Sequence, residues 1–394
     1  MLDFSRVGFD AAMRIQEQKG VDFGSKYPLV KMSSLCTMNI PKSEAKSYPD
    51  DTAASFIDMS SVSIEGKIIT MTDRPIRELW TGSYNFFRDG DIICAKMMSN
   101  ADNMKCAIAE GLTNGIGFGS SEFYTFRCGE KVMTRYLCEF LNLQAVRESA
   151  WASVTGTGRL RVPSRFYETL LIPLPPMDIQ HKISTECQAV DSRSASLTSR
   201  ISQCRTRIEA LYRETESLPS ASRLAFDDKR SFTISIGKRV LNSELIPSGK
   251  IPVFSANVFE PFGYVDSLLK GFEDFTRDSI LWGIDGDFMV NFLTKDTQFY
   301  PTDHCGVLRV LTGKIHPRYA ARVLEREGKS LGFSRSYRAS LDRVGRITFD
   351  VPDIEAQTKA MTEVLPLEAE IAQAKKDLES LSGQKSAILK KYLQ

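Results

Sequence analysis

The sequence predicts an α+β protein in which two mixed, strand-rich globular domains are joined by two long helices that form an antiparallel coiled coil. Three features support this prediction: two heptad segments, a Pro-containing motif before each of them, and short β-like runs elsewhere. A chain of 394 residues is too long for one ordinary core and suits two domains.

Two segments carry apolar or small residues at alternating gaps of four and three, which is typical of a coiled-coil seam. In the first segment the positions are Ile183, Cys187, Val190, Ser194, Leu197, Ile201, Cys204, Ile208, Leu211 and Thr215. The second segment has the same gaps at Ala360, Val364, Leu367, Ile371, Ala374, Leu378, Leu381, Lys385, Ile388 and Tyr392. We expect the aliphatic members of both sets to form the seam of two uninterrupted helices.

Each heptad segment follows a similar entry motif, IPLPPMDIQHKI at residues 172–183 and DVPDIEAQTKA at residues 350–360. Aligning Gln180 with Gln357 gives an offset of 357 − 180 = 177, and Pro175 then falls on Pro352. Every seam position of the first segment falls on its counterpart in the second. The chain is therefore predicted to be a tandem duplication of a globular domain followed by a long helix.

At about 1.5 Å per residue each helix would be roughly 50–60 Å long. A helix with one narrow apolar seam needs a partner to cover that seam. We therefore expect the two helices to pack on each other in antiparallel orientation. The alternative is that each helix docks separately on its own domain.

The globular parts contain β-like runs bounded by Gly, Asn, Asp and Pro, namely ASFIDMS, GKIITMT, GDIICAKM, KIPVFSAN and DSILWGI. Helical patches are expected in VMTRYLCEFLNLQAVRESAWAS and in PRYAARVLEREGKSL, and ESLPSASRLAFDDKR is expected to be a linker. The predicted boundaries are 1–172 for the first domain, 173–218 for the central helix, 219–350 for the second domain and 351–394 for the C-terminal helix.

The composition excludes several classes of protein. The net charge is only +2, so the chain is not uniformly basic, and a nucleic-acid reader of this composition must gather its Lys and Arg on certain faces. Eight scattered Cys without a CxxC pair, together with three His, predict no metal site. No apolar run is long enough for a membrane span or a signal peptide, so we expect a soluble, reduced, cytoplasmic protein with no membrane partner.

Short motifs occur in the same order in both halves. The first half contains DGDIICAK, GFGSSEFYTFR, TGTGRLRVP and LIPLPPMDIQHKI, and the second half contains GKIPVFSAN, DSILWGIDG, YPTDHCGVLR, FSRSYRASLDRV and FDVPDIEAQ. With a heptad helix after each set, the chain resembles the specificity subunits of Type I restriction–modification systems over essentially its whole length. The second set is the more divergent, with Pro-Thr-Asp-His in place of Gly-Ser-Ser-Glu-Phe.

The resemblance implies two target-recognition domains, each reading one half of a split sequence in double-stranded DNA, with the helices fixing the gap between the halves. It also implies DNA methyltransferase subunits as partners, with an ATP-dependent restriction subunit as an optional further partner. In this interpretation the chain is not an enzyme and binds no cofactor, because S-adenosylmethionine, Mg and ATP belong to the partner subunits.

Candidate DNA-binding residues are basic or amide side chains on polar loops, because such side chains reach base edges and phosphates. In the first domain they are Lys96, Asn100, Asn103, Lys105, Arg159, Arg161 and Arg165, and in the second domain Arg335, Tyr337, Arg338 and Arg343. Arg or Lys would pair with guanine and Asn with adenine, while others would only hold phosphates. For any single residue the alternative is a solvated surface charge.

Two further patterns are candidate chemical sites. GIGFGSS at residues 115–121 is a weak match to a nucleotide-binding loop, because a strand-like run rather than a helix follows it. His304, with its neighbours Asp303 and Cys305, favours a structural polar patch, since adjacent strand residues point to opposite faces. Two other functions remain open: a specificity subunit of a Type II-like methylase–nuclease, and a coiled-coil scaffold that binds no DNA.

Overall fold

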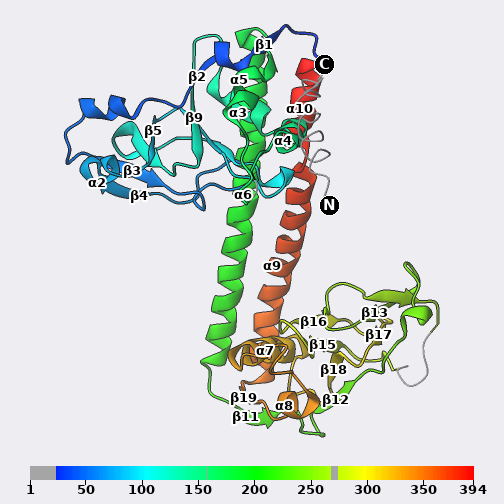
Figure 1. Ribbon diagram of the computed structural model, residues 1–394. Helices are drawn as coiled ribbons and strands as arrows, with labels where there is room; N and C mark the ends of the chain where they lie inside the picture. Colours follow the sequence, from blue (N-terminus) through cyan, green and yellow to red (C-terminus); the bar gives the residue numbers. More distant parts are fainter. Residues whose placement is uncertain (1–23, 157, 268–273) are drawn as a thin grey trace, which may run out of the picture. The chain divides into compact units, whose positions relative to one another are not determined.

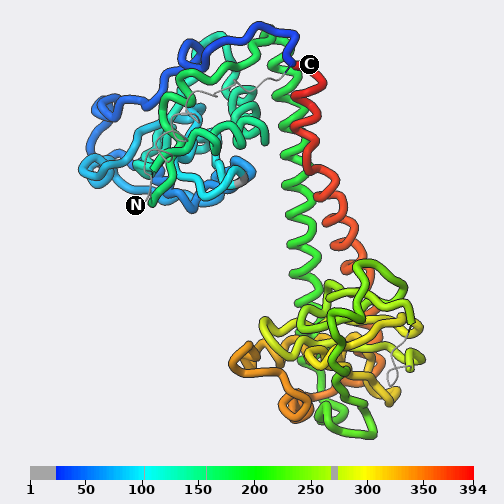
Figure 2. The backbone as a smooth tube through the Cα atoms, turned by 45° about the vertical axis from the view of Figure 1, so that its right-hand side comes forward, coloured from blue at the N-terminus to red at the C-terminus, as the bar shows by residue number. Residues whose placement is uncertain are grey.

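The computed structural model describes residues 24–156, 158–267 and 274–394, which form two compact units (Figure 1 and Figure 2). The first unit comprises the chain up to Leu197 together with Lys376–Gln394, and the second comprises Thr198–Lys375. Each unit has an α+β globular part and stretches of long helix. The boundaries expected from the sequence stay predictions, and residues 1–23 of the first predicted domain lie outside the described residues.

The globular part of the first unit is built on two four-stranded sheets. One sheet is antiparallel and has the order β2 (Cys36–Met38), β9 (Phe123–Cys128), β6 (Ile92–Ala95) and β7 (Cys106–Ile108). The other has the order β4 (Thr72–Pro75), β3 (Ala53–Ile57), β8 (Ile116–Gly119) and β5 (Asn85–Arg88), with β3 and β8 parallel. A third pair joins β1 (Leu29–Lys31) to β10 (Leu171–Pro173).

Short helices complete this globular part. They are α2 (Ile76–Trp80), α3 (Thr134–Leu141), α4 (Gln144–Ala152) and α5 (Ser164–Thr169), with 3-10 turns η1 (Met32–Ser34), η2 (Lys42–Ser47), η3 (Ala101–Asn103) and η4 (Thr113–Gly115). The helical patch expected over residues 132–153 is thus two helices, which are separated at Asn142 and Leu143.

The second unit repeats this plan in smaller form. Its antiparallel sheet has the order β12 (Phe232–Ile236), β18 (Cys305–Val310), β15 (Ser279–Gly283) and β16 (Val290–Leu293). Its other sheet has the order β14 (Gly263–Val265), β13 (Ile251–Phe254) and β17 (Tyr300–Pro301), and β13 pairs with β17 in parallel, as β3 does with β8. The remaining elements are β11 (Ser222–Ala225) paired with β19 (Thr348–Val351), η5 (Asn242–Glu244), α7 (Pro317–Ser330) and α8 (Leu341–Gly345).

The long helices are α6 (Met177–Glu216), α9 (Ile354–Leu381) and α10 (Gln384–Leu393). The expectation of an uninterrupted C-terminal helix is wrong, because Gly383 adopts a positive φ of 80° between α9 and α10. A glycine takes this left-handed conformation without the steric penalty that a side chain would add. Pro366, in contrast, is accommodated inside α9.

None of the seam positions expected from the heptads is exposed in the structure; each is buried or half-buried. Within the second unit, α6 and α9 run antiparallel, because Arg200 pairs with Glu370 and Arg207 pairs with Glu363 at 3.0 Å. Within the first unit the C-terminal segment also runs antiparallel to α6, since Asp191 pairs with Lys385 at 2.8 Å and Glu186 pairs with Lys391 at 3.0 Å. The helix ends also enter the globular cores, where Ile183 joins one cluster and Leu211 joins the other.

Three local predictions need correction. GKIITMT, residues 66–72, forms no strand before β4 beyond a single bridge at Ile68, and Ile69 is 62% exposed. The expected linker at residues 216–230 contains strand β11. The expectation of a reduced protein also needs correction at one place, because Cys94 and Cys106 face each other across β6 and β7 in a disulfide.

A buried glutamine joins each globular part to its long helix in the same way. In the first unit, Gln180 accepts a hydrogen bond from the Met133 N–H (2.8 Å) and donates to the carbonyls of Lys131 (3.1 Å) and Pro175 (2.9 Å). Gln180 is 1% exposed, so no water can replace these partners. We call this arrangement the glutamine contact.

The second unit contains the same contact at the position 177 residues later. Gln357 accepts from the His316 N–H (2.9 Å) and donates to the carbonyls of Lys314 (3.2 Å) and Pro352 (2.8 Å). It is fully buried. The repeat seen in the sequence is therefore also a repeat of hydrogen bonds, and each contact fixes the loop that leads into α3 or α7 against the first turn of a long helix.

Replacing Gln180 by Leu should destabilise the first unit by about 1–3 kcal/mol, because the Met133 N–H and the carbonyls of Lys131 and Pro175 lose the partner that Gln180 provides. Hydrogen exchange measured by mass spectrometry should show faster exchange over residues 131–137. Gln188→Leu, at an exposed position of α6, is the matched control. Unchanged protection of residues 131–137 in Gln180→Leu would contradict this role.

Candidate nucleic-acid interface

The first candidate loop follows β6 and is shaped by its own hydrogen bonds. The Asn100 side chain accepts from the Asn103 N–H (3.0 Å) and caps η3, while the Asn103 amide donates to the Ser99 hydroxyl. Lys105 Nζ donates to the Met59 carbonyl at 3.2 Å. Capping by Asn100 holds the turn in one conformation, so these amides shape the loop in addition to being available at its surface.

Lys96 lies at the base of the same loop. Its Nζ donates to the Ser121 carbonyl (2.6 Å) and lies 5.0 Å from the centre of the Tyr124 ring. Burial lowers the pKa of Lys96 from its ordinary value. The lysine therefore links the exit of β6 to the turn before β9 rather than extending freely into solvent.

The second candidate loop is a short hairpin ahead of α5. Thr155 and Arg161 exchange backbone hydrogen bonds of 3.0 Å in both directions, and Gly156 makes the turn with a φ of +119°. Arg159 and Arg165 are exposed. Neither guanidinium has a hydrogen-bonding partner among the described residues, so both are available to an external anion.

Arg161 differs from these two arginines because it is bound side-on to a carboxylate. Its Nε donates to Glu122 Oε2 (2.8 Å) and its Nη2 donates to Glu122 Oε1 (2.6 Å). The hydrogen bond from Arg161 holds the pKa of Glu122 below its usual value. Through this contact, the hairpin meets the turn between β8 and β9, where Lys96 also binds.

In the second unit the candidate residues lie between α7 and α8. Tyr337 stacks on Phe333 with ring centres 5.4 Å apart, and the Arg343 guanidinium lies 4.3 Å from the Tyr337 ring centre. Arg343 also donates from Nη1 to the Arg338 carbonyl at 2.8 Å. Arg335 is exposed at the edge of this stack. The stack presents a polar, mostly basic surface.

A hollow of about 580 Å³ beside this stack is lined by Asp285, His304, Arg335 and Arg338. Arg338 donates from Nη2 to Asp285 Oδ2 at 2.7 Å, and His304 Nδ1 contacts the same oxygen. Burial would raise the pKa of Asp285, but the hydrogen bonds from Arg338 and His304 outweigh it and lower that pKa. The carboxylate is thus ionised and shared between two donors.

The expectation for His304 rested on a strand that does not include it. Asp303 and His304 lie in the turn before β18, so their side chains are not forced to opposite faces, and His304 Nε2 is 3.9 Å from Asp303 Oδ2. Cys305, the first residue of β18, is fully buried. The polar patch at His304 is therefore made with Asp285 from another segment, which the sequence pattern did not indicate.

Neither Glu122 nor Asp285 was predicted from the sequence, and the contact of His304 with Asp285 was not predicted either, although the basic residues were placed in groups that the structure brings together. Each missed residue follows or precedes a strand whose partner is distant in the sequence. A signal was nevertheless present, because each lies inside one of the repeated motifs, GFGSSEFYTFR, DSILWGIDG and YPTDHCGVLR.

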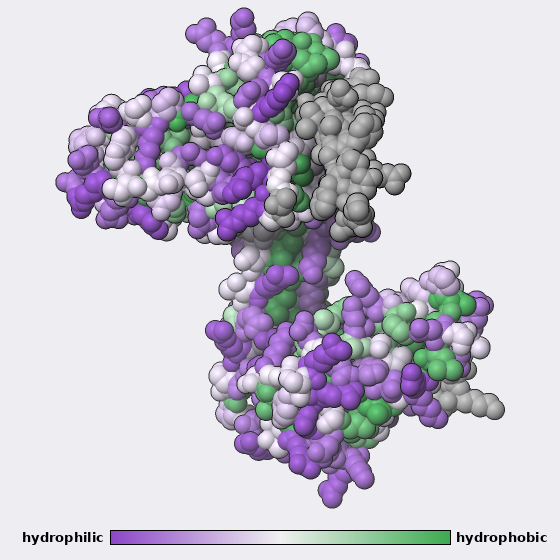
Figure 3. Space-filling model, viewed as in Figure 1, coloured by the Kyte–Doolittle hydropathy of each residue, from purple (hydrophilic) through white to green (hydrophobic). Residues whose placement is uncertain are grey.

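On the visible face of each unit, hydrophilic side chains dominate the globular surface (Figure 3).

The glycines of GIGFGSS have a packing role. Gly117 and Gly119 lie on β8, and a Cβ at Gly117 would come within 2.4 Å of the Phe87 ring. The described residues contain no group of three or more His, Cys, Asp or Glu side chains suited to a metal ion. Among the helices that the structure describes, none has the length and apolar character of a membrane span.

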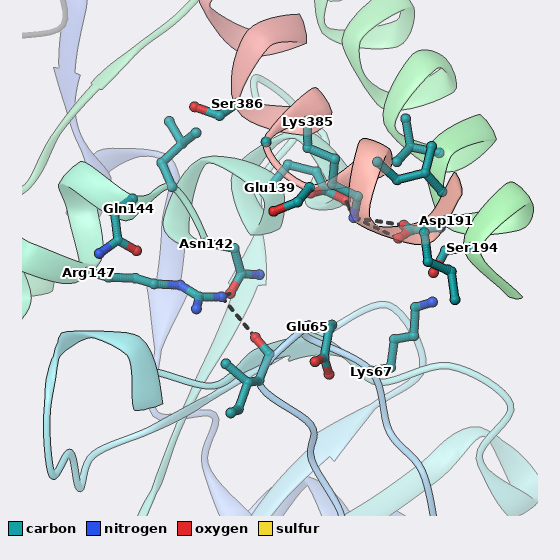
Figure 4. Close-up of a pocket in the computed structure, with 17 residues that line it drawn as sticks. Glu65, Lys67, Glu139, Asn142, Gln144, Arg147, Asp191, Ser194, Lys385 and Ser386 are labelled. Atoms are coloured by element: carbon teal, nitrogen blue, oxygen red, sulfur yellow. Dashed lines mark hydrogen bonds and ion pairs between the residues drawn. The ribbon is translucent and has the colours of Figure 1, made fainter. Parts of the chain in front are cut away.

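A polar pocket of about 500 Å³ lies in the first unit between α3, α4, α6 and the end of the chain (Figure 4). Lys385 occupies a seam position there and bonds to two carboxylates, Glu139 Oε1 (2.9 Å) and Asp191 Oδ1 (2.8 Å). Burial raises the pKa of Glu139, whose side chain is only 7% exposed. The two carboxylates outweigh the effect of burial on Lys385 and raise its pKa. This cluster explains why a lysine is tolerated in an apolar seam.

Comparisons with known proteins point to one family. Residues 232–380 match the family model described as the Type I restriction modification DNA specificity domain. The chain is 37% identical over 102 residues to the Type I restriction enzyme EcoAI specificity subunit of Escherichia coli, a match covering 25% of this chain and 17% of that protein. It is 29% identical over 177 residues to the EcoEI specificity subunit of Escherichia coli, covering 43% of this chain and 29% of that protein. The matches span less than a third of these relatives' length.

Solved structures share the fold over nearly the whole chain. The S subunit of the Type I restriction–modification system from M. genitalium has a TM-score of 0.62 at 18% identity, covering 94% of this chain and 96% of that one. A chain from a structure on complex assembly and conformational transition of the type I R-M system has a TM-score of 0.55 at 16% identity, covering 93% and 97%. At these identities the likeness establishes the fold.

Replacing Lys385 by Met should destabilise the first unit by about 3–5 kcal/mol, because Glu139 would lose the cation that bonds to it and Asp191 would be left with Arg135 at 3.6 Å. Unfolding in urea at several pH values measures this effect, with Lys390→Met at an exposed position of α10 as the control.

The pH dependence has a definite sign. The pKa of Glu139 is higher in the folded protein than the ordinary value of 4.5. Ionisation of this buried carboxyl therefore costs no stability below pH 4.5, and the cost grows as the pH rises through the folded pKa. The difference between Lys385→Met and the parent should therefore shrink as the pH falls from 8 towards 4.5. A difference that is independent of pH would contradict this account of the cluster.

Proposed function

We propose that this chain, a relative of the specificity subunits of Type I restriction enzymes, recognises a split sequence in double-stranded DNA and directs DNA methyltransferase subunits to it. The observation that carries the proposal is the duplicated fold, in which a cluster of arginines lies between a helix, α4 or α7, and the strand that leads into the long helix, β10 or β19, in each copy. A single reading domain would need only one such cluster. Two copies suit a target in two halves.

Two linked reading domains also make energetic sense. Each domain alone would make few base contacts, and tethering raises the effective concentration of the second domain once the first has bound. The exposed arginines supply the sequence-independent attraction to phosphates, while the residues that bind base edges supply discrimination. The modest net charge fits this division, since only selected loops are basic.

We infer that α6, α9 and α10 form an antiparallel coiled coil that separates the two half-sites and offers a surface to the methyltransferase subunits. Supporting this, ion pairs within each unit place α6 antiparallel to the C-terminal segment. An ATP-dependent restriction subunit is an optional further partner. The length of the helices would then set the number of unread base pairs.

We also infer that the chain performs no chemistry and works in the cytoplasm. S-adenosylmethionine, Mg and ATP would be bound by the partner subunits. The packing of Gly117 and Gly119 against Phe87 supports this inference, because it gives the glycines of GIGFGSS a structural role in place of nucleotide binding.

Co-expression of the chain with its neighbouring methyltransferase gene, followed by single-molecule sequencing of host DNA, tests the proposal. We expect methylated adenines in one two-part motif with a fixed unread gap. A purified complex that methylates no motif and binds DNA without salt dependence would contradict it and favour the scaffold.

The exposed arginines without internal partners should act mainly on phosphates. Replacing Arg159, Arg165 and Arg335 by Ala should weaken binding to all DNA sequences alike and reduce the slope of log K against log salt concentration by about 0.9 for each phosphate that is no longer neutralised. Arg213→Ala, at an exposed position of α6, is the control. An unchanged slope in the triple variant would show that these arginines do not bind DNA.

A further inference from the structure

Arg161 occupies a defined place in the topology of the first unit. Lys96, which directly follows β6, donates its N–H to the Glu122 carbonyl (2.7 Å). This hydrogen bond ties the end of β6 to the turn before β9. The Lys96 carbonyl in turn accepts from the Val162 N–H (2.9 Å). Arg161 is the residue just before Val162, so its side chain starts where three segments meet.

Arg338 occupies the equivalent place in the second unit. The Ile284 N–H donates to the His304 carbonyl (3.0 Å), and the Ile284 carbonyl accepts from the Ala339 N–H (3.0 Å). Arg338 precedes Ala339 just as Arg161 precedes Val162, and 338 − 161 = 177, the offset of the sequence repeat. Backbone hydrogen bonds and sequence register therefore assign these two arginines to each other independently.

Both arginines present the same edge to a carboxylate. In each, Nε and Nη2 bind the two oxygens of one acid, Glu122 in the first unit and Asp285 in the second. The acids come from different places, because Glu122 lies in the turn before β9 and Asp285 follows β15. His304, which stands at the position of Glu122, contacts Asp285 instead. Both units thus pair this arginine with a carboxylate, although the acid comes from a different segment in each unit.

The carboxylate lies beneath the guanidinium in both units. The Glu122 and Asp285 side chains are 21% and 22% exposed, against 42% for Arg161 and 51% for Arg338. The Nη1 group of each arginine has no partner among the described residues. A guanidinium has donors on two edges, so the edge formed by Nη1 and the second Nη2 hydrogen remains available towards solvent.

We propose that Arg161 and Arg338 each read one guanine, in the first and second half-site respectively, and that Glu122 and Asp285 are positioning residues that aim them. The inference rests on the proposed function. The free edge matches guanine, which offers O6 and N7 as neighbouring acceptors in the major groove. The carboxylate offsets the positive charge, which weakens attraction to phosphates and favours a directional contact with a base.

The test uses the complex of this chain with its methyltransferase subunits and duplexes of the methylated motif. Each guanine is replaced in turn by 7-deazaguanine, which lacks the N7 acceptor. We expect one guanine in each half-site whose replacement weakens binding on the order of tenfold. Arg161→Ala should abolish that sensitivity in one half-site only, and Arg338→Ala in the other half-site only.

Two further kinds of variant separate the reading of a base from the positioning of the arginine. Arg161→Lys and Arg338→Lys keep the charge but lose the planar fork, so they should also lose the sensitivity to 7-deazaguanine. Glu122→Gln and Asp285→Asn should reduce the sensitivity at the same guanine, and should add nothing when combined with the arginine variant of that unit. Binding to unrelated DNA should stay the same in the Lys variants, which keep the charge, and should not weaken in Glu122→Gln and Asp285→Asn, which leave the charge of the arginine unbalanced.

The controls are exposed ion pairs elsewhere in the same units. Glu110→Gln removes the acid that pairs with Arg135 at 3.0 Å, and Asp342→Asn removes the acid that pairs with Arg346 at 2.8 Å. Neither should alter the sensitivity to 7-deazaguanine, and thermal unfolding should confirm that all variants are folded.

The failure of this inference can be told apart from failure of the proposed function. A two-part methylated motif in which no guanine depends on Arg161 or Arg338, or in which the Lys variants read as well as the parent, would overturn the inference alone. The absence of any two-part motif would overturn the proposed function as well.

Discussion

One buried glutamine in each unit ties the globular part to its long helix, beside the apolar packing of Ile183 in the first unit and Val364 in the second. The buried side chains of Gln180 and Gln357 each make hydrogen bonds to three backbone groups. A buried amide that makes several hydrogen bonds tolerates little displacement, because each broken bond leaves an unsatisfied group. The loops before α3 and α7 are therefore fixed relative to the first turn of α6 and α9.

Much of the fold could be predicted because its signals are local. The heptads indicated long helices, and the shared Pro and Gln of the entry motifs indicated duplication. The parallel pairs β3–β8 and β13–β17 could not be predicted, because they join residues that are 62 and 47 positions apart, as in Ser55 with Gly117 and Val253 with Tyr300, and such pairing leaves no periodic trace. The break at Gly383 was also missed, since the heptad continues in phase across it.

The candidate site could likewise be predicted only in part. Clusters of Arg, Lys and Asn stood out because several occur within a few residues of each other. Glu122 and Asp285 did not, because each is a single acid whose arginine lies 39 or 53 residues further along the chain. Likewise, the seam pattern does not show that Lys385 pairs with Glu139, which lies 246 residues earlier in the chain. Ionic partners distant in sequence become visible only when the fold brings them together.

The central claim is that each half of the chain reads its own half of the DNA target. Replacing residues 219–350 by the corresponding domain of a relative, and mapping the motif methylated by the resulting complex, tests this most directly. The account predicts that one half of the motif changes while the other half and the length of the gap stay the same. A change in both halves, or an unchanged motif in an assembled and active complex, would contradict it.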